Sequence, residues 1–179
     1  QNLSGWDVNK ILTAPDDFSL NANSSMVDPV WNTTGSYKFS DKDELVQAVN
    51  MYTGTAKEDA LEIYGEINTW DTSLVTDMSQ LFADKTSFDE DIGDWDTSSV
   101  TNMSGMFNGA SAFNQNIGNW DVVKVTNMSN MFKDASVFNK DISTKTLTEY
   151  TAWDVSGVKN MKAMFNGASA FNKDIGNWI

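Results

Sequence analysis

The sequence predicts an α/β solenoid, in which short parallel strands and short helices form a right-handed coil behind a helical N-terminal cap. The first observation is a sequence repeat: the segment "MSGMFNGASAFNQNIGNWDV" at 103–122 recurs with small changes at 78–97, 128–142 and 161–178. The second is the regular spacing of tryptophan, with steps of 25, 25, 33 and 25 residues between Trp70, Trp95, Trp120, Trp153 and Trp178. A fixed period of this size is typical of units that bury their apolar faces only against their neighbours.

The unit between Trp95 and Trp120 illustrates the elements that we expect. Val100, Met103, Met106 and Phe107 follow the spacing of one helical face, and Asn108-Gly109 is a helix-ending pair. The segment "SAFNQNI" that follows is typical of a short extended piece, and Trp120 closes the turn. We therefore expect a core that repeats every 25 residues, with its first members Trp70, Val75, Met78, Phe82, Phe88 and Ile92.

The segment before the first repeat predicts two short helices. "SDKDELVQAVNMYTG" begins with Ser40 and carries Asp43 three positions later, which is a capping-box pattern. "TAKEDALEIYG" shows a similar capping pattern from Thr55 and ends at Gly65, a helix-stop residue. We expect these helices to cover the first repeat, because a solenoid without a cap exposes its core.

Three segments follow from these patterns. Residues 1–34 are predicted to be the end of a preceding repeat array and an irregular linker, 35–66 the helical cap, and 67–179 a solenoid of about four coils. The longer tryptophan step places an insertion at 143–152, which we expect to project from one edge while both flanking coils keep their register. Its large side chains, Leu147 and Tyr150, are the predicted contact residues, and a tolerated surface loop is the simpler alternative.

Aligned Asp and Asn residues recur after each Trp, before each Ile and after each Phe. Two interpretations stay open: the side chains hydrogen-bond the backbone within each turn, or acidic columns bind Ca²⁺. The first is favoured, because a residue that the fold needs recurs in every unit. The calcium alternative would use Asp91, Asp96, Asp121, Asp141, Asp154 and Asp174.

The composition of the chain argues against several classes of function. The net charge of −13 argues against binding nucleic acid or an anionic membrane through a basic face. No apolar run reaches the roughly 20 residues of a membrane span. His and Cys are both absent, and no nucleophile motif is present, so we expect no enzymatic activity, no catalytic residue and no cofactor.

The aligned pattern "W-D-x-S-x-V-T-N-M-S-x-M-F-x-x-A-x-x-F-N-x-x-I-G-x-W" resembles the BspA-like surface-protein repeat, over roughly 70–178. The chain departs from it at Asp77, Lys85, Lys162 and the insertion. The resemblance implies a leucine-rich-repeat-like fold, a cell-surface or extracellular location and a role in adhesion or interaction, with unidentified protein or surface-glycan partners. It implies no catalytic activity.

Two functions are therefore predicted. The first is a surface module for adhesion or protein–protein interaction. The alternative is a structural subunit of an extracellular filament that assembles head-to-tail, because "QNLSGWDVNKI" at the start aligns with "QNIGNWDVVKV" at 115–125 and the chain ends at a repeat Trp. The predicted assembly interface consists of Leu3, Trp6, Phe171, Ile175 and Trp178. Asn2, Asn23 and Asn32 lie in sequons that could carry glycan.

Overall fold

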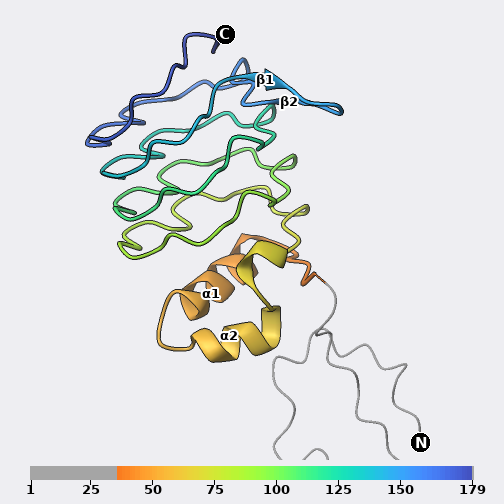
Figure 1. The fold of residues 1–179 in the computed structure, drawn as a ribbon. Helices are drawn as coiled ribbons and strands as arrows, with labels where there is room; N and C mark the ends of the chain where they lie inside the picture. The colour runs from red at the N-terminus through yellow and green to blue at the C-terminus, as the bar shows by residue number, and fades with distance from the viewer. Residues whose placement is uncertain (1–35, 179) are drawn as a thin grey trace, which may run out of the picture.

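A computed structural model describes residues 36–178 of the chain. Helix α1 (Lys42–Tyr52) and helix α2 (Lys57–Tyr64) come first, followed by the short 3₁₀ helix η1 (Ile67–Thr69). The repeats then lie one above another beyond the helices, and the strands β1 (Lys145–Thr146) and β2 (Thr151–Ala152) project near the far end (Figure 1). The predicted segment 1–34 lies outside the described residues.

Both predicted helices are present, with caps that differ by one residue from those expected. Asp41 rather than Ser40 is the N-cap of α1, and its carboxylate accepts the N–H of Glu44 at 3.0 Å. Glu44 in turn accepts the N–H of Ser40 at 2.8 Å, so a reciprocal capping arrangement forms one step further along. Helix α1 buries the apolar stripe of Leu45, Ala48, Val49 and Tyr52.

The predicted fold class is wrong. Within residues 36–178 the repeats contain no α-helix and no parallel β-strand. The single strand pair, β1 with β2, is antiparallel, and each of its strands is two residues long. Parallel contacts between repeats are isolated bridges, as between Asp77 and Asn102. A leucine-rich-repeat-like coil of parallel strands and short helices therefore does not describe this chain. Instead, each repeat is a series of turns that we call a layer. Each layer ends at its Trp, and the layers are 71–95, 96–120, 121–153 and 154–178.

Every second backbone N–H in these segments bonds to the next layer, which explains why no helix forms. In the first layer the N–H groups of Met78, Gln80, Phe82 and Asp84 donate to carbonyls of the next layer at 2.8–3.0 Å. The peptide groups between them instead close turns within the layer, as from Leu81 N–H to the Met78 carbonyl. An α-helix needs every N–H to point along one axis. Because half of these groups bond sideways, the segment becomes a row of turns that is joined to its neighbour.

Residues with positive φ make this alternation of bonds possible. Two positions, four residues apart, have positive φ in every layer, as at Gly105 (63°) and Gly109 (73°). Positive φ at the third residue of a β-turn is the requirement of a type II turn, which Gly, Asn and Asp meet most easily. The same position holds Gln80 (61°) in the first layer and Ala163 (55°) in the last, so the bonds between layers impose the conformation there.

The core follows the predicted columns. Trp70, Val75, Met78, Phe82, Phe88 and Ile92 are all buried, as predicted. Their equivalents stack ring on ring, as Phe107 does with Phe82 and Phe132 at centroid distances of 5.5 Å. From the second layer on, the Trp indole N–H donates to a carbonyl of the preceding layer, as Trp120 does to Ile92 at 3.2 Å. Trp70 and Trp95 donate instead to carbonyls that precede the first layer. The core is therefore a set of columns along the stack.

The insertion leaves the register of the flanking layers intact, as predicted. Met128 N–H donates to the Asn160 carbonyl at 2.8 Å, and Phe132 N–H to the Met164 carbonyl at 2.9 Å, across the longer step. The extra residues form the β1–β2 hairpin, which extends beyond the side of the stack (Figure 1).

Candidate interaction surfaces

The aligned Asp and Asn side chains bond the backbone, which confirms the structural interpretation of these columns. At the start of each described layer, the Asp that follows a Trp accepts the N–H two residues later, as Asp96 does from Ser98 at 2.9 Å. Before each Ile the same turn recurs, as between Asp91 and Gly93 at 2.9 Å. The equivalents are Asp71, Asp121 and Asp154 after Trp, and Asn116, Asp141 and Asp174 before Ile.

The column after each Phe is a ladder between layers. Asn114 N–H donates to Asp89 at 2.8 Å, Asn139 N–H to Asn114 at 3.0 Å, and Asn172 N–H to Asn139 at 3.0 Å. A further turn column, which we did not predict, lies at Asp77, Asn102, Asn127 and Asn160. Its signal was the recurring Asp or Asn two residues before a Ser in the first three layers and before Lys162 in the last, the spacing at which such a side chain reaches the backbone.

Each of the six candidate calcium ligands accepts a hydrogen bond from a backbone N–H through a carboxylate oxygen. Hydrogen bonds from Ser143 hold the pKa of Asp141 below its usual value, with the charges of Lys145 and Lys173 acting in the same direction. Among residues 36–178, no group of three or more His, Cys, Asp or Glu side chains is placed to hold a metal ion.

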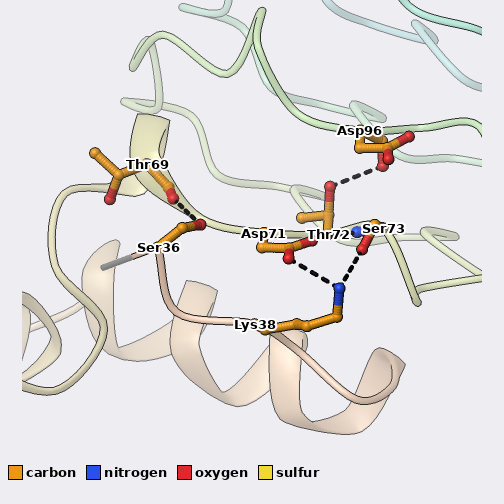
Figure 2. Close-up of polar contacts among 7 residues, drawn as sticks. All are labelled: Ser36, Lys38, Thr69, Asp71, Thr72, Ser73 and Asp96. Carbon is orange, nitrogen blue, oxygen red and sulfur yellow. Dashed lines mark hydrogen bonds and ion pairs between the residues drawn. The ribbon is translucent and has the colours of Figure 1, made fainter. Parts of the chain in front are cut away.

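The cap is joined to the first layer by lysines. Lys38 Nζ lies 3.0 Å from Asp71 Oδ2 and 2.8 Å from Ser73 Oγ (Figure 2). In the same view the buried Thr72 hydroxyl donates to the Asp96 carbonyl at 2.9 Å, which ties the first layer to the second. Ser36 bonds the Thr69 carbonyl beside them. Separate polar contacts thus join the cap to the first layer and the first layer to the second.

Two departures from the repeat pattern belong to this junction. Asp77 stands where later layers have Asn, and its carboxylate lies 3.3 Å from Lys42 of α1. Lys85 stands where later layers have Ala, and its ammonium donates to Asn50 of α1 at 2.8 Å. A third pair joins Lys57 and Glu90 at 2.9 Å. These side chains match the first layer to its cap.

The hairpin side chains have separate roles. Leu147 packs against the core while its N–H donates to the Tyr150 carbonyl at 2.8 Å. Tyr150 is 36% exposed, and its hydroxyl donates to the carbonyl of Asn119 in the second layer. Partial burial raises the pKa of Tyr150, and the negative charges of Asp121, Asp96 and Glu149 raise it further. The aromatic ring is therefore partly exposed, and the negative charges of two layers and of the hairpin act on its hydroxyl.

The predicted assembly residues fall into two groups. Phe171, Ile175 and Trp178 lie together on the last layer, where each is only half-buried although it packs against the core. Trp178 stacks on Trp153 at 6.0 Å with the rings 1° apart. Leu3 and Trp6 lie outside the described residues, as do Asn2, Asn23 and Asn32.

Comparison with known proteins gives the class. The family model described as "Mycoplasma protein of unknown function, DUF285" matches residues 47–178, well over half of the chain. The chain belongs to this family and is a repeat protein. No curated protein and no solved structure matches it. In the described part of the chain, neither helix is long and apolar enough to cross a bilayer.

Proposed function

We propose that this chain is a non-enzymatic cell-surface or extracellular protein of the BspA-like type, which mediates adhesion or protein–protein interaction. The observation that carries the proposal is the hairpin. It is the one interruption of the 25-residue period among the described layers, and it presents Tyr150 at the surface, where the negative charges of Asp96 and Asp121 act on its hydroxyl. An exposed aromatic ring beside charged groups is a common centre of protein interfaces.

Charge indicates the kind of partner. The chain carries 25 acidic and 12 basic residues, so it repels most acidic proteins. The carboxylates that raise the pKa of Tyr150 belong to Asp121, Asp96 and Glu149, and none of them is in a salt bridge among the described residues. A basic protein surface could pair with these carboxylates while a Lys or Arg side chain lies over the ring. The favoured partner is therefore a basic protein.

Binding to a panel of immobilised extracellular proteins, from acidic to basic, tests the proposal on the full chain. We expect binding to basic members, weakened by salt because exposed charges are screened. Tyr150→Ala should weaken it at least about tenfold, whereas Leu74→Ala should not. Leu74 is a matched control because it is an exposed apolar residue (53%) in the first layer. Equal binding by Tyr150→Ala, or no binding to any member, would contradict the proposal.

The second candidate function is the filament subunit. The half-buried rings of the last layer favour it, because another subunit could cover them. Head-to-tail addition gives an open polymer unless the rotation closes a ring. Sedimentation over about a hundredfold range of concentration tests it: a mass that rises with concentration is expected for a subunit, and one unchanging species argues against it.

A further inference from the structure

Val123 is an exposed departure from the repeat, and it lies in the same layer as the hairpin. It is 46% exposed and belongs to the turn that the Val125 N–H closes on the Val122 carbonyl at 2.9 Å. The equivalent residue of each other described layer is a serine, namely Ser73, Ser98 and Ser156. Serine is a common turn residue, whereas the β-branched side chain of valine favours extended backbone. Neither core burial nor turn formation therefore explains Val123.

The carboxylate of Asp121 begins the same turn and keeps one oxygen available. Its Oδ1 accepts the Val123 N–H at 3.1 Å. Among residues 36–178 the carboxylate makes no salt bridge, although Lys124 is only three positions later. The equivalent Asp71 of the first layer differs, because Lys38 lies 3.0 Å from it. Asp121 can therefore pair with a cation from a partner.

Tyr150 adds an aromatic ring to this turn from the hairpin. Its hydroxyl donates to the carbonyl of Asn119, two residues before Asp121. Partial burial raises the pKa of this hydroxyl, and the charge of Asp121 raises it further, so the two side chains lie within electrostatic range. Because the hydrogen bond at its tip holds the ring in place, little side-chain freedom is lost when a partner covers it.

These three groups occur together in the third layer alone among the described layers. The other layers keep the carboxylate but follow it with serine instead of valine. The hairpin, and with it the exposed ring, interrupts the third layer only. An aliphatic side chain, a carboxylate and an aromatic ring at one bend suit a ligand that has an apolar stem and a flat cation.

Arginine has this chemistry. Its methylene stem can lie along an aliphatic side chain while the charged head stays in contact with water and polar groups. Its planar guanidinium pairs with a carboxylate through two parallel hydrogen bonds and stacks on an aromatic ring. Lysine carries the same charge, but its ammonium group is compact and strongly hydrated, and it cannot form the two parallel bonds.

We propose that Val123, Asp121 and Tyr150 form one site for an arginine side chain of the basic partner. The guanidinium pairs with Asp121 and lies against the Tyr150 ring, and the methylene stem packs on Val123. This inference rests on the proposed function, because it takes the partner to be a basic protein that binds at the hairpin. It adds the kind of basic residue that the partner presents and a second contact residue, Val123.

Fluorescent octa-arginine and octa-lysine peptides test the site on the full chain, because the two peptides carry equal charge. The unchanged protein should bind octa-arginine at least about fivefold more tightly than octa-lysine. Val123→Ser restores the serine of the other layers and should reduce this preference at least about threefold. Asp121→Asn should reduce it further, and the turn should persist because Asn102 makes the same bond to the Ser104 N–H at 3.1 Å.

Val137→Ser is the matched control. Val137 is 43% exposed and lies in another turn of the same layer, which the Phe138 N–H closes on the Ala135 carbonyl at 3.2 Å. Ser87 holds the equivalent position in the first layer, so this change also inserts a residue that the repeat accepts. The arginine preference should stay unchanged in this variant. Unchanged midpoints of urea unfolding show that each variant is folded.

Nuclear magnetic resonance provides a second measurement that needs no variant. Octa-arginine should shift the methyl resonances of Val123 and the ring resonances of Tyr150, and it should leave the methyl resonances of Val137 in place. Equal affinity for the two peptides, equal effects of Val123→Ser and Val137→Ser, or unshifted Val123 resonances would each overturn the site.

The peptide assay also separates this site from the proposed function. Binding to basic extracellular proteins that depends on Tyr150 but shows no arginine preference would overturn the arginine site and support the proposed function. An arginine preference that depends on Val123, together with no binding to any extracellular protein, would support the site and contradict the proposed function.

Discussion

Replacing Phe107 by alanine should remove a central contact of the aromatic columns. Phe107 is fully buried. Its ring stacks on Phe82 and Phe132 in the adjacent layers, both at 5.5 Å, and on Phe113 in its own layer at 4.0 Å. The change therefore affects three layers at once, and rigid stacking above and below leaves little room for the site to collapse.

The magnitude follows from the burial. A Phe side chain that buries about 150 Å² more than Ala, at about 25 cal/mol per Å², contributes about 4 kcal/mol. Loss of favourable ring pairs adds to this value, and partial relaxation of the neighbours subtracts from it. We expect a loss of about 3–5 kcal/mol in the free energy of unfolding, the range seen for buried aromatic truncations.

Phe165→Ala is the matched control. Phe165 occupies the same column in the last layer, but it is half-buried and stacks on only one neighbouring layer, on Phe132 at 5.6 Å. Its truncation should cost about half as much as that of Phe107. Urea unfolding followed by circular dichroism measures both losses. A loss below about 1 kcal/mol for Phe107→Ala, or an equal loss for both variants, would refute the column account.

Three other predictions follow from the layers. Gly109→Ala should cost about 1–2 kcal/mol, because φ is 73° and the added Cβ would lie 2.5 Å from Asp84 Oδ1, whereas Gly176→Ala should be nearly neutral in the same urea assay. Partial burial opposes ionisation of Asp77, but hydrogen bonds from Ser79 and the charge of Lys42 outweigh it and lower its pKa. A lowered folded-state pKa stabilises the fold above the unfolded value of about 3.9, so acid unfolding should show this stability being lost as the pH falls below about 4, and Asp77→Asn should reduce that loss. Millimolar Ca²⁺ and chelator should leave Tm unchanged; a strong rise with Ca²⁺ would restore the calcium interpretation.

The buried columns could be predicted from the sequence because they depend only on spacing. Once Trp70, Met78 and Phe82 return every 25 residues, any stacked arrangement places like residues over like. The backbone-bonding role of the aligned Asp and Asn was accessible for the same reason. A side chain that reaches the N–H two residues later needs only the local sequence.

The backbone conformation of each layer could not be predicted from the same apolar pattern. Apolar residues at Met103, Met106 and Phe107 suit a helix, but they suit a row of turns equally well. The distinguishing signal was the pair of turn-forming residues four apart, Gly105 and Gly109, which repeats as Asn130 and Asp134. We interpreted Gly109 as the end of a helix. The hydrogen bonds that decide the matter join residues about 25 apart, and local propensity does not report them.

Departures from the repeat are therefore the residues to examine for function. A layer constrains nearly every position, since its core, its turns and its bonds to both neighbours all require a given residue type. Asp77 and Lys85 depart from the pattern and are explained by the cap. Lys162 departs where other layers have Ser, and nothing in the structure explains it. The hairpin is the largest departure. It adds an antiparallel strand pair and a partly exposed Tyr150, while the bonds between its flanking layers keep their register. The Tyr150 hydroxyl donates to the Asn119 carbonyl of the second layer while its ring stays partly exposed, so urea unfolding of Tyr150→Ala beside the binding assay separates a structural role from an interaction role.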